Sequence, residues 1–167
     1  MFRKRLLLIQ VMVVLFAFVP GCGRPAGNQA KVVLPKFASL QEAEEWCKNN
    51  LKYQNDDPWD PAPDLESVFK DGHGDCKMLA GAVHEVLKSV GQESKIVTIL
   101  RKDWHMFVMY REGENWRVID NARLKPTVFR DPDEIKTVYG VKEFVRVSDS
   151  YAEFQSWFNQ EVYPRYK

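Results

Sequence analysis

Three features are missing from this sequence, and each absence narrows the range of possible functions. No apolar run reaches the roughly 20 residues that a membrane-spanning helix needs, since the longest run, residues 6–19, is shorter and contains Gln10. No excess of basic charge points to a nucleic-acid partner, because 24 Lys and Arg residues are balanced by 23 Asp and Glu residues. The sequence also has no internal repeat and no low-complexity tract. What is present, 45% hydrophobic residues of which many are aromatic, is ample for a single packed domain preceded by a leader.

The N-terminal residues have the order of an export signal. Basic residues within positions 1–5 precede the apolar run, and the sequence Val-Pro-Gly-Cys at residues 19–22 begins with its last residue. This pattern resembles the signal peptide of bacterial lipoproteins, in which the cysteine becomes the lipidated N-terminus, and an ordinary signal peptide cut nearby is the alternative. In both cases the protein is exported, to the periplasm or the cell surface. We expect a signal peptide over residues 1–21, lipid on Cys22, a loose tether over residues 22–36 and the folded domain over residues 37–167.

Periodicity predicts helices in the first half of the domain and strands in the second. Ser39 and Glu42 form an S-x-x-E capping box, and Asp75 is a suitable cap for a later helix that Gly91 ends. Helices first and strands afterwards indicate an α+β fold, with N-terminal helices packed on an antiparallel sheet. The expected helices span residues 40–52, 64–70, 76–90 and 150–162, the expected strands span residues 95–100, 104–110, 115–121 and 143–147, and residues 53–63 form a loop.

Cys76 lies at the start of the clearest of these helices, within the stretch DGHGDCKMLAGAV at residues 71–83. A helix N-terminus stabilises a thiolate, and its unpaired N–H groups can stabilise an oxyanion. Gly81 should cost about 1 kcal/mol relative to alanine inside a helix, so we expect another element to approach closely there. A strand with His105 passing over Ala80 and Gly81 would bring an imidazole to the sulfur. Cys47 is a possible disulfide partner of Cys76, and a disulfide between the two would block the nucleophile.

The hairpin formed by residues 104–110 and 115–121 predicts a partner for His105. A four-residue loop at 111–114 places His105 directly opposite Asp120, on the same face of the sheet. A carboxylate that accepts a hydrogen bond from one imidazole nitrogen fixes the tautomer and leaves the other nitrogen to act as a base. Cys76, His105 and Asp120 are therefore the predicted nucleophile, base and orienting group.

These motifs resemble the transglutaminase-like cysteine peptidase superfamily, which is papain-like in its wider relations. The resemblance rests on GDC at a helix start, HMFVMY on a strand and WRVIDN on the next strand, and it covers roughly residues 40–125. It implies a transglutaminase-like core with the triad Cys76, His105 and Asp120. The implied activity is cleavage of amide or peptide bonds through a thioester intermediate, with hydrolysis favoured over transamidation.

The resemblance leaves the remainder of the site less defined. Gln54 is the natural amide donor to the oxyanion, with Tyr53 or Trp59 as alternatives. Lys77 and Met78 stand where many bacterial members carry acidic residues, which disfavours a calcium site. No metal and no other cofactor is expected. The expected substrate is a protein, a peptide or peptidoglycan, the lipid attaches the chain to a membrane, and we expect a monomer.

Other interpretations of the same residues remain open. Cys76 could be an inert buried thiol, and His105 could be a core histidine. His73, three residues before Cys76, is a rival base, whereas His84 is about 12 Å along the helix by its rise. The domain could also be a non-catalytic lipoprotein module that binds peptide or cell-wall material in the same cleft. Four aspartates could bind a cation, although a solvated loop with Asx turns is the more common arrangement: Asp56, Asp57, Asp60 and Asp64.

Overall fold

The computed structural model describes residues 34–55, 61–62, 64–141 and 144–165. Its main helices are α1 (Leu40–Asn50), α2 (Glu66–Asp71), α3 (Cys76–Ser89), α4 (Ile135–Val138) and α5 (Tyr151–Trp157), and α5 continues as a π-helical turn over Phe158–Val162. Its strands are β1 (Lys52–Tyr53), β2 (His73–Gly74), β3 (Ser94–Leu100), β4 (Trp104–Glu112), β5 (Asn115–Asp120), β6 (Arg123–Phe129) and β7 (Phe144–Ser148), with short 3-10 turns at Pro132–Glu134 and Tyr163–Arg165.

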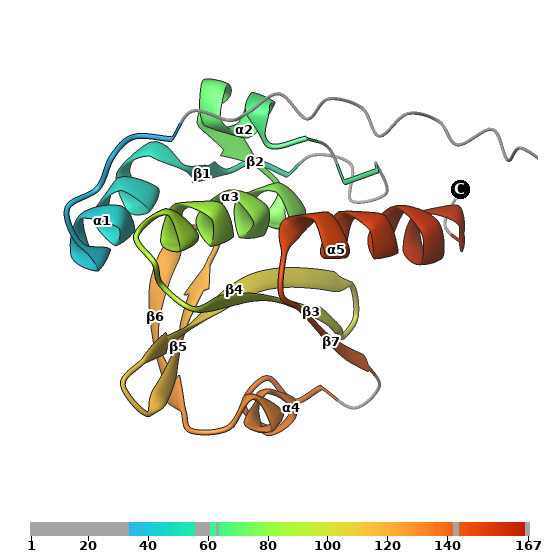
Figure 1. The fold of residues 1–167 in the computed structure, drawn as a ribbon. Coiled ribbons are helices and arrows are strands. Elements are labelled where there is room, and N and C mark those ends of the chain that lie inside the picture. Colours follow the sequence, from blue (N-terminus) through green and yellow to red (C-terminus); the bar gives the residue numbers. More distant parts are fainter. Residues whose placement is uncertain (1–33, 56–60, 63, 142–143, 166–167) are drawn as a thin grey trace, which may run out of the picture.

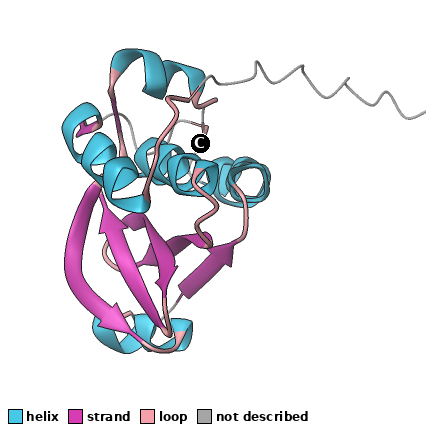
Figure 2. Cartoon of the chain, turned by 60° about the vertical axis from the view of Figure 1, so that its left-hand side comes forward, coloured by secondary structure: helices cyan, strands magenta, loops and turns pink. Residues whose placement is uncertain are grey.

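A five-stranded sheet in the order β6-β5-β4-β3-β7 forms the centre of the fold, and every neighbouring pair in it is antiparallel. Helices α3 and α5 lie on one side of the sheet and α4 lies on the other, as Figure 1 shows. Figure 2 shows how strongly the strands twist between these helical layers. The predicted α+β class, with helices packed on an antiparallel sheet, is confirmed. None of the helices within the described residues is long and apolar enough to cross a membrane.

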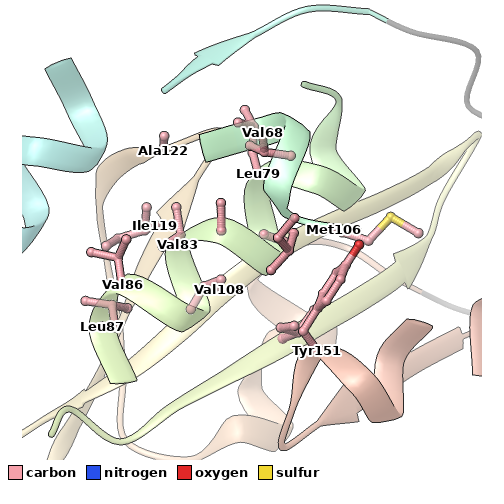
Figure 3. Close-up of a cluster of buried hydrophobic side chains, with 14 of the residues drawn as sticks. Val68, Leu79, Val83, Val86, Leu87, Met106, Val108, Ile119, Ala122 and Tyr151 are labelled. Atoms are coloured by element: carbon pink, nitrogen blue, oxygen red, sulfur yellow. The ribbon is translucent and has the colours of Figure 1, made fainter. Parts of the chain in front are cut away.

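Alternation along β4 separates two apolar cores, because successive side chains of a strand point to opposite faces. Met106 and Val108 pack with the buried side of α3, and Figure 3 shows this cluster between the helix and the sheet. Phe107 and Met109 point the other way and pack with Ile135 of α4. Helix α3 is consequently buried along most of its length, and both faces of the sheet are covered along residues 106–110 of β4.

Both ends of α3 have the caps that the sequence predicts. The Asp75 side chain accepts hydrogen bonds from the backbone N–H groups of Lys77 (2.8 Å) and Met78 (3.1 Å). At the other end Gly91 has φ +74° and donates to the Lys88 carbonyl at 3.0 Å, and Gln92 donates to the Leu87 carbonyl at 3.1 Å. This second pair of bonds is a Schellman motif. The cap at Asp75 makes Cys76 the first helical residue.

The predicted register of the β4–β5 hairpin is wrong by two residues. Strand β4 continues to Glu112, which pairs with Asn115, so the loop is Gly113-Glu114 rather than residues 111–114. Gly113 has φ +61° at the first loop position, as a tight type II′ hairpin turn requires. A shift of two residues preserves the face on which each side chain lies, because the side-chain period of a strand is two. His105 and Asp120 therefore share a face as predicted, but as diagonal rather than directly opposed neighbours.

Several elements are absent from the sequence-based prediction. Strand β6 pairs with β5 across a turn in which Asn121 (φ +50°) and Ala122 (φ +59°) both have left-handed backbone angles. Alanine is uncommon there, so the dipeptide lacks the Asn-Gly signal that marks such a hairpin. Helix α4 was also missed, and so was the short parallel pair of β1 with β2. Tyr53 lies in β1 rather than in the predicted loop.

Candidate active site

The helix start places Cys76 against the sheet. Cys76 is partly buried, and its Sγ lies 3.7 Å from the Sδ of Met106 on β4. Met106 is the direct neighbour of His105, so this contact fixes the first turn of α3 beside the beginning of β4. Helix α3 thus carries the sulfur to the strand that carries the predicted base.

His105 and Asp120 are joined by a hydrogen bond of 2.9 Å between Nε2 of the imidazole and Oδ1 of the carboxylate. The side chain of His105 is 30% exposed and that of Asp120 is 16% exposed, so the pair is largely shielded from solvent. Since Asp120 occupies Nε2, Nδ1 is the nitrogen that remains for another partner.

Cys76 is the second group that acts on the protonation of His105. Burial lowers the pKa of His105, but hydrogen bonds with Asp120 and Cys76 and the charges of both groups raise it, to a net value of about 9. The imidazole therefore carries its proton at neutral pH. The structure brings together the three predicted residues Cys76, His105 and Asp120 from α3, β4 and β5.

The surroundings of Asp120 were not foreseen from the sequence. Its second oxygen, Oδ2, lies 3.9 Å from Nζ of Lys125 on β6, a strand that the sequence did not predict. Tyr139, which follows α4, is partly buried near it, and burial together with the charge of Asp120 raises the Tyr139 pKa to about 12. The left-handed residues Asn121 and Ala122 come directly after Asp120 and turn the chain away. These groups limit the positions that the carboxylate can adopt.

The β1–β2 pairing brings Gln54 close to the helix start. Tyr53 pairs with Gly74, and the backbone N–H of Gln54 donates to the Gly74 carbonyl at 2.9 Å. Gln54 is exposed, and its backbone lies beside the segment that leads into Cys76. Tyr53 is 49% exposed and its hydroxyl donates to the side chain of Asn55 at 3.1 Å. Trp59, the third candidate for this role, lies outside the described residues.

Cys47 does not form a disulfide with Cys76, since both thiols are free. Cys47 is fully buried in α1, and burial, with a smaller contribution from Glu44, raises its pKa to about 12. A buried thiol of this kind is unreactive, whereas Cys76 is partly accessible. The described residues thus contain one accessible thiol.

The remaining candidate residues lie elsewhere. His73 is exposed on β2, and His84 is buried in α3, where its Nδ1 contacts the Ser94 hydroxyl at 3.0 Å. Cys22 and three of the four loop aspartates lie outside the described residues. No group of three or more His, Cys, Asp or Glu side chains within the described ranges is arranged to hold a metal ion.

The close approach expected at Gly81 is confirmed, but the approaching element is not the strand that the sequence suggested. A Cβ atom at Gly81 would lie 2.4 Å from a ring carbon of Tyr151 and 2.8 Å from a methyl group of Leu65. The close approach is therefore made by the first residue of α5 and by the segment before α2, not by the strand that carries His105. Gly81 positions α5 on α3, and the contact between Cys76 and β4 does not depend on it.

Comparison with known protein families identifies the superfamily of the chain. The model of the transglutaminase-like superfamily matches residues 26–161. The chain belongs to the transglutaminase-like superfamily. Among curated proteins no significant match is found. Among solved structures, the chain is similar to a candidate cysteine protease from Cytophaga hutchinsonii, with 16% sequence identity and a TM-score of 0.41. That similarity covers 64% of this chain and 40% of the other.

Proposed function

We propose that this protein is a cysteine hydrolase that cleaves amide or peptide bonds with Cys76, His105 and Asp120. The observation that carries the proposal is the environment of His105, which is bonded to a carboxylate through Nε2 and interacts with the only accessible thiol of the described residues. A protonated imidazole beside a thiol favours the thiolate, which is the nucleophilic form. The resting site is then a thiolate–imidazolium pair.

The reaction proceeds in two steps. The Cys76 thiolate attacks the carbonyl carbon, and the C–N bond breaks as the His105 imidazolium gives its proton to the leaving amine, which yields a thioester. His105, now neutral, accepts a proton from a water molecule that attacks the thioester. The C–S bond breaks, the acid is released and the thiolate–imidazolium pair returns. An amine in place of water would give transamidation, and we favour water.

Asp120 and the helix start support these steps. The Asp120 carboxylate holds the ring so that Nδ1 is directed to the sulfur, and it stabilises the imidazolium. Because the Asp75 cap uses the N–H groups of Lys77 and Met78, the N–H of Cys76 is the donor of this turn that the cap leaves for an oxyanion. Gln54 is our candidate for the second donor.

The same proposal includes export and a lipid anchor on Cys22. The order of basic residues, apolar run and cysteine at the N-terminus supports it. A protein at the periplasmic or outer surface would meet proteins, peptides or peptidoglycan as substrates. Mass spectrometry of the protein isolated from membranes tests this part: a diacylglyceryl group on Cys22 supports it, and an unmodified Cys22 contradicts it.

The test of the activity is to incubate the purified protein with a mixed peptide library and with isolated peptidoglycan, and to analyse products by mass spectrometry. We expect new carboxyl ends, and a thioester on Cys76 after acid quenching. Cys76→Ser, which preserves the size of the side chain, should give neither. The alternative is a binding module. It is favoured if wild type and Cys76→Ser retain the same ligand equally and neither forms a product.

A further inference from the structure

Cys76 lies between two charged residues that are themselves buried. Asp75 is 4% exposed and Lys77 is 2% exposed, and Nζ of Lys77 forms an ion pair with Oδ2 of Asp75. Ionised side chains are rarely this buried unless they are paired. The same Lys77 ammonium lies 5.7 Å from the ring centroid of Phe158, in the π-helical turn after α5. The pair is therefore fixed on two sides, by α3 and by the C-terminal helix.

The two oxygens of Asp75 have different roles. Oδ1 caps α3 by accepting two backbone hydrogen bonds, and Oδ2 binds the lysine. The cap thus places a charged carboxylate on the residue that directly precedes the proposed nucleophile. Two neighbouring negative charges repel one another, and this repulsion is strong where water is excluded. A cation paired with the same carboxylate reduces this repulsion.

We propose that Lys77 is a positioning residue that compensates the charge of the Asp75 cap and so allows Cys76 to be a thiolate at neutral pH. This inference rests on the proposed role of Cys76 as the nucleophile.

The other titratable groups around the start of α3 belong to five elements, β2, β4, β5, β6 and α5. His105 faces the thiol from β4, with Asp120 of β5 and Lys125 of β6 behind it. Tyr151 of α5 is close to Asp75, and burial and the charges of Asp75 and Asp64 raise the Tyr151 pKa, so the phenol stays neutral. His73 of β2 is exposed. Lys77 is thus the cation on the side of the helix cap, and the imidazolium is the cation on the side of the sheet.

The test measures the rate of Cys76 alkylation by iodoacetamide against pH in the full-length protein, with labelling sites assigned by mass spectrometry. Lys77→Met leaves the cap charge uncompensated and should move the midpoint of the profile upward by about one pH unit. Asp75→Asn retains the capping oxygen but removes its charge, so it should move the midpoint downward. The midpoint of the double variant should lie near that of wild type. Lys77→Arg keeps the positive charge, so its midpoint should equal that of wild type.

A structural role alone predicts a different pattern. It would change the folded fraction or the amplitude of labelling in Lys77→Met without moving the midpoint, and that result overturns the proposal. If Lys77→Met does not fold, Asp75→Asn alone decides, because an unchanged midpoint in that variant also overturns it. Failure of the nucleophile proposal is recognised separately: His105→Ala would then have the same profile as wild type, whichever way the Lys77 variants behave.

Discussion

Two histidines near opposite ends of helix α3, the partly buried His105 of β4 and the buried His84 of α3, show opposite behaviour. His105 lies at the N-terminal end, where its pKa is raised to about 9, and His84 lies toward the C-terminal end, where its pKa is lowered to about 4. Burial lowers the pKa in both cases. The partner makes the difference, because His105 is bonded to the Asp120 carboxylate whereas His84 contacts the neutral Ser94 hydroxyl and also experiences the positive charge of Lys88.

Concavity and partner chemistry point to opposite ends of the helix. A pocket of about 390 Å³ lies at the His84 end, lined also by Lys88, Gln92, Glu93, Ser94, Lys95 and Asp149. It includes neither Cys76 nor His105. A neutral histidine with a hydroxyl partner can neither stabilise a thiolate nor return a proton to a leaving group at neutral pH. Partner chemistry, rather than the shape of the surface, is therefore the basis on which we propose the Cys76 end as the site.

The largest predicted difference between the two histidines appears when each imidazole is removed in turn. His105→Ala should lower the rate of amide hydrolysis by about 10²–10⁴-fold, the usual contribution of a positioned acid–base group. His84→Gln is the matched control and should leave the rate within about twofold. Steady-state hydrolysis of a peptide identified in the library screen measures both. Equal losses in the two variants would mean that His105 acts only through folding.

The second prediction concerns stability in acid. The folded-state pKa of His84, about 4, lies below the unfolded value of 6.5, so the folded chain binds fewer protons between these limits. Stability is then lost as the pH falls from about 6.5 to 4, by on the order of 3 kcal/mol from this residue. Urea unfolding at pH 7 and pH 4.5 should show this loss in wild type and a smaller loss in His84→Gln. The same pH dependence in both proteins would contradict the prediction.

His105 should act in a different pH window and with the opposite sign. Its folded-state pKa of about 9 exceeds the unfolded value of 6.5, so the stability it contributes is present below about pH 6.5 and is lost as the pH rises to 9. Asp120→Asn removes the charge that stabilises the proton on His105. The alkaline limb of the activity profile should therefore shift to lower pH by about one to two units. The pH dependence of kcat/KM measures this shift, and an unmoved limb would show that Asp120 does not control His105.

The smallest predicted effect is at the partner of His84. Ser94→Ala leaves Nδ1 of a buried imidazole without its hydrogen bond and should cost about 1–2 kcal/mol of unfolding free energy. Hydrolysis should be unchanged, because Ser94 is remote from Cys76. A urea titration at pH 7 gives the stability change, and a loss of activity at full folding would show that the two ends of α3 are coupled.

The sequence was sufficient to predict the features that depend on local pattern. Asp75 and Gly91 mark the ends of α3 by cap chemistry, and alternation places His105 and Asp120 on one face whichever even register applies. The register itself depends on how far β4 extends. Because Arg111 and Glu112 are charged, the sequence pattern assigned them to the loop rather than to the strand. Strand β6 was missed because Ala122 is in a left-handed conformation that single-residue preferences do not predict. The Lys77–Asp75 pair and the contact of Tyr151 with Gly81 depend on how α5 packs, which no local pattern specifies.

The most direct test of the central claim is an NMR titration of the histidine ring resonances between pH 3.5 and 10. We predict one midpoint near 9 that belongs to the Cys76–His105 pair and falls in Cys76→Ser, and a second near 4 from His84. A His105 midpoint near 6.5 that does not respond to Cys76→Ser would contradict the account, because the imidazole would then be neither held by Asp120 nor paired with the thiol.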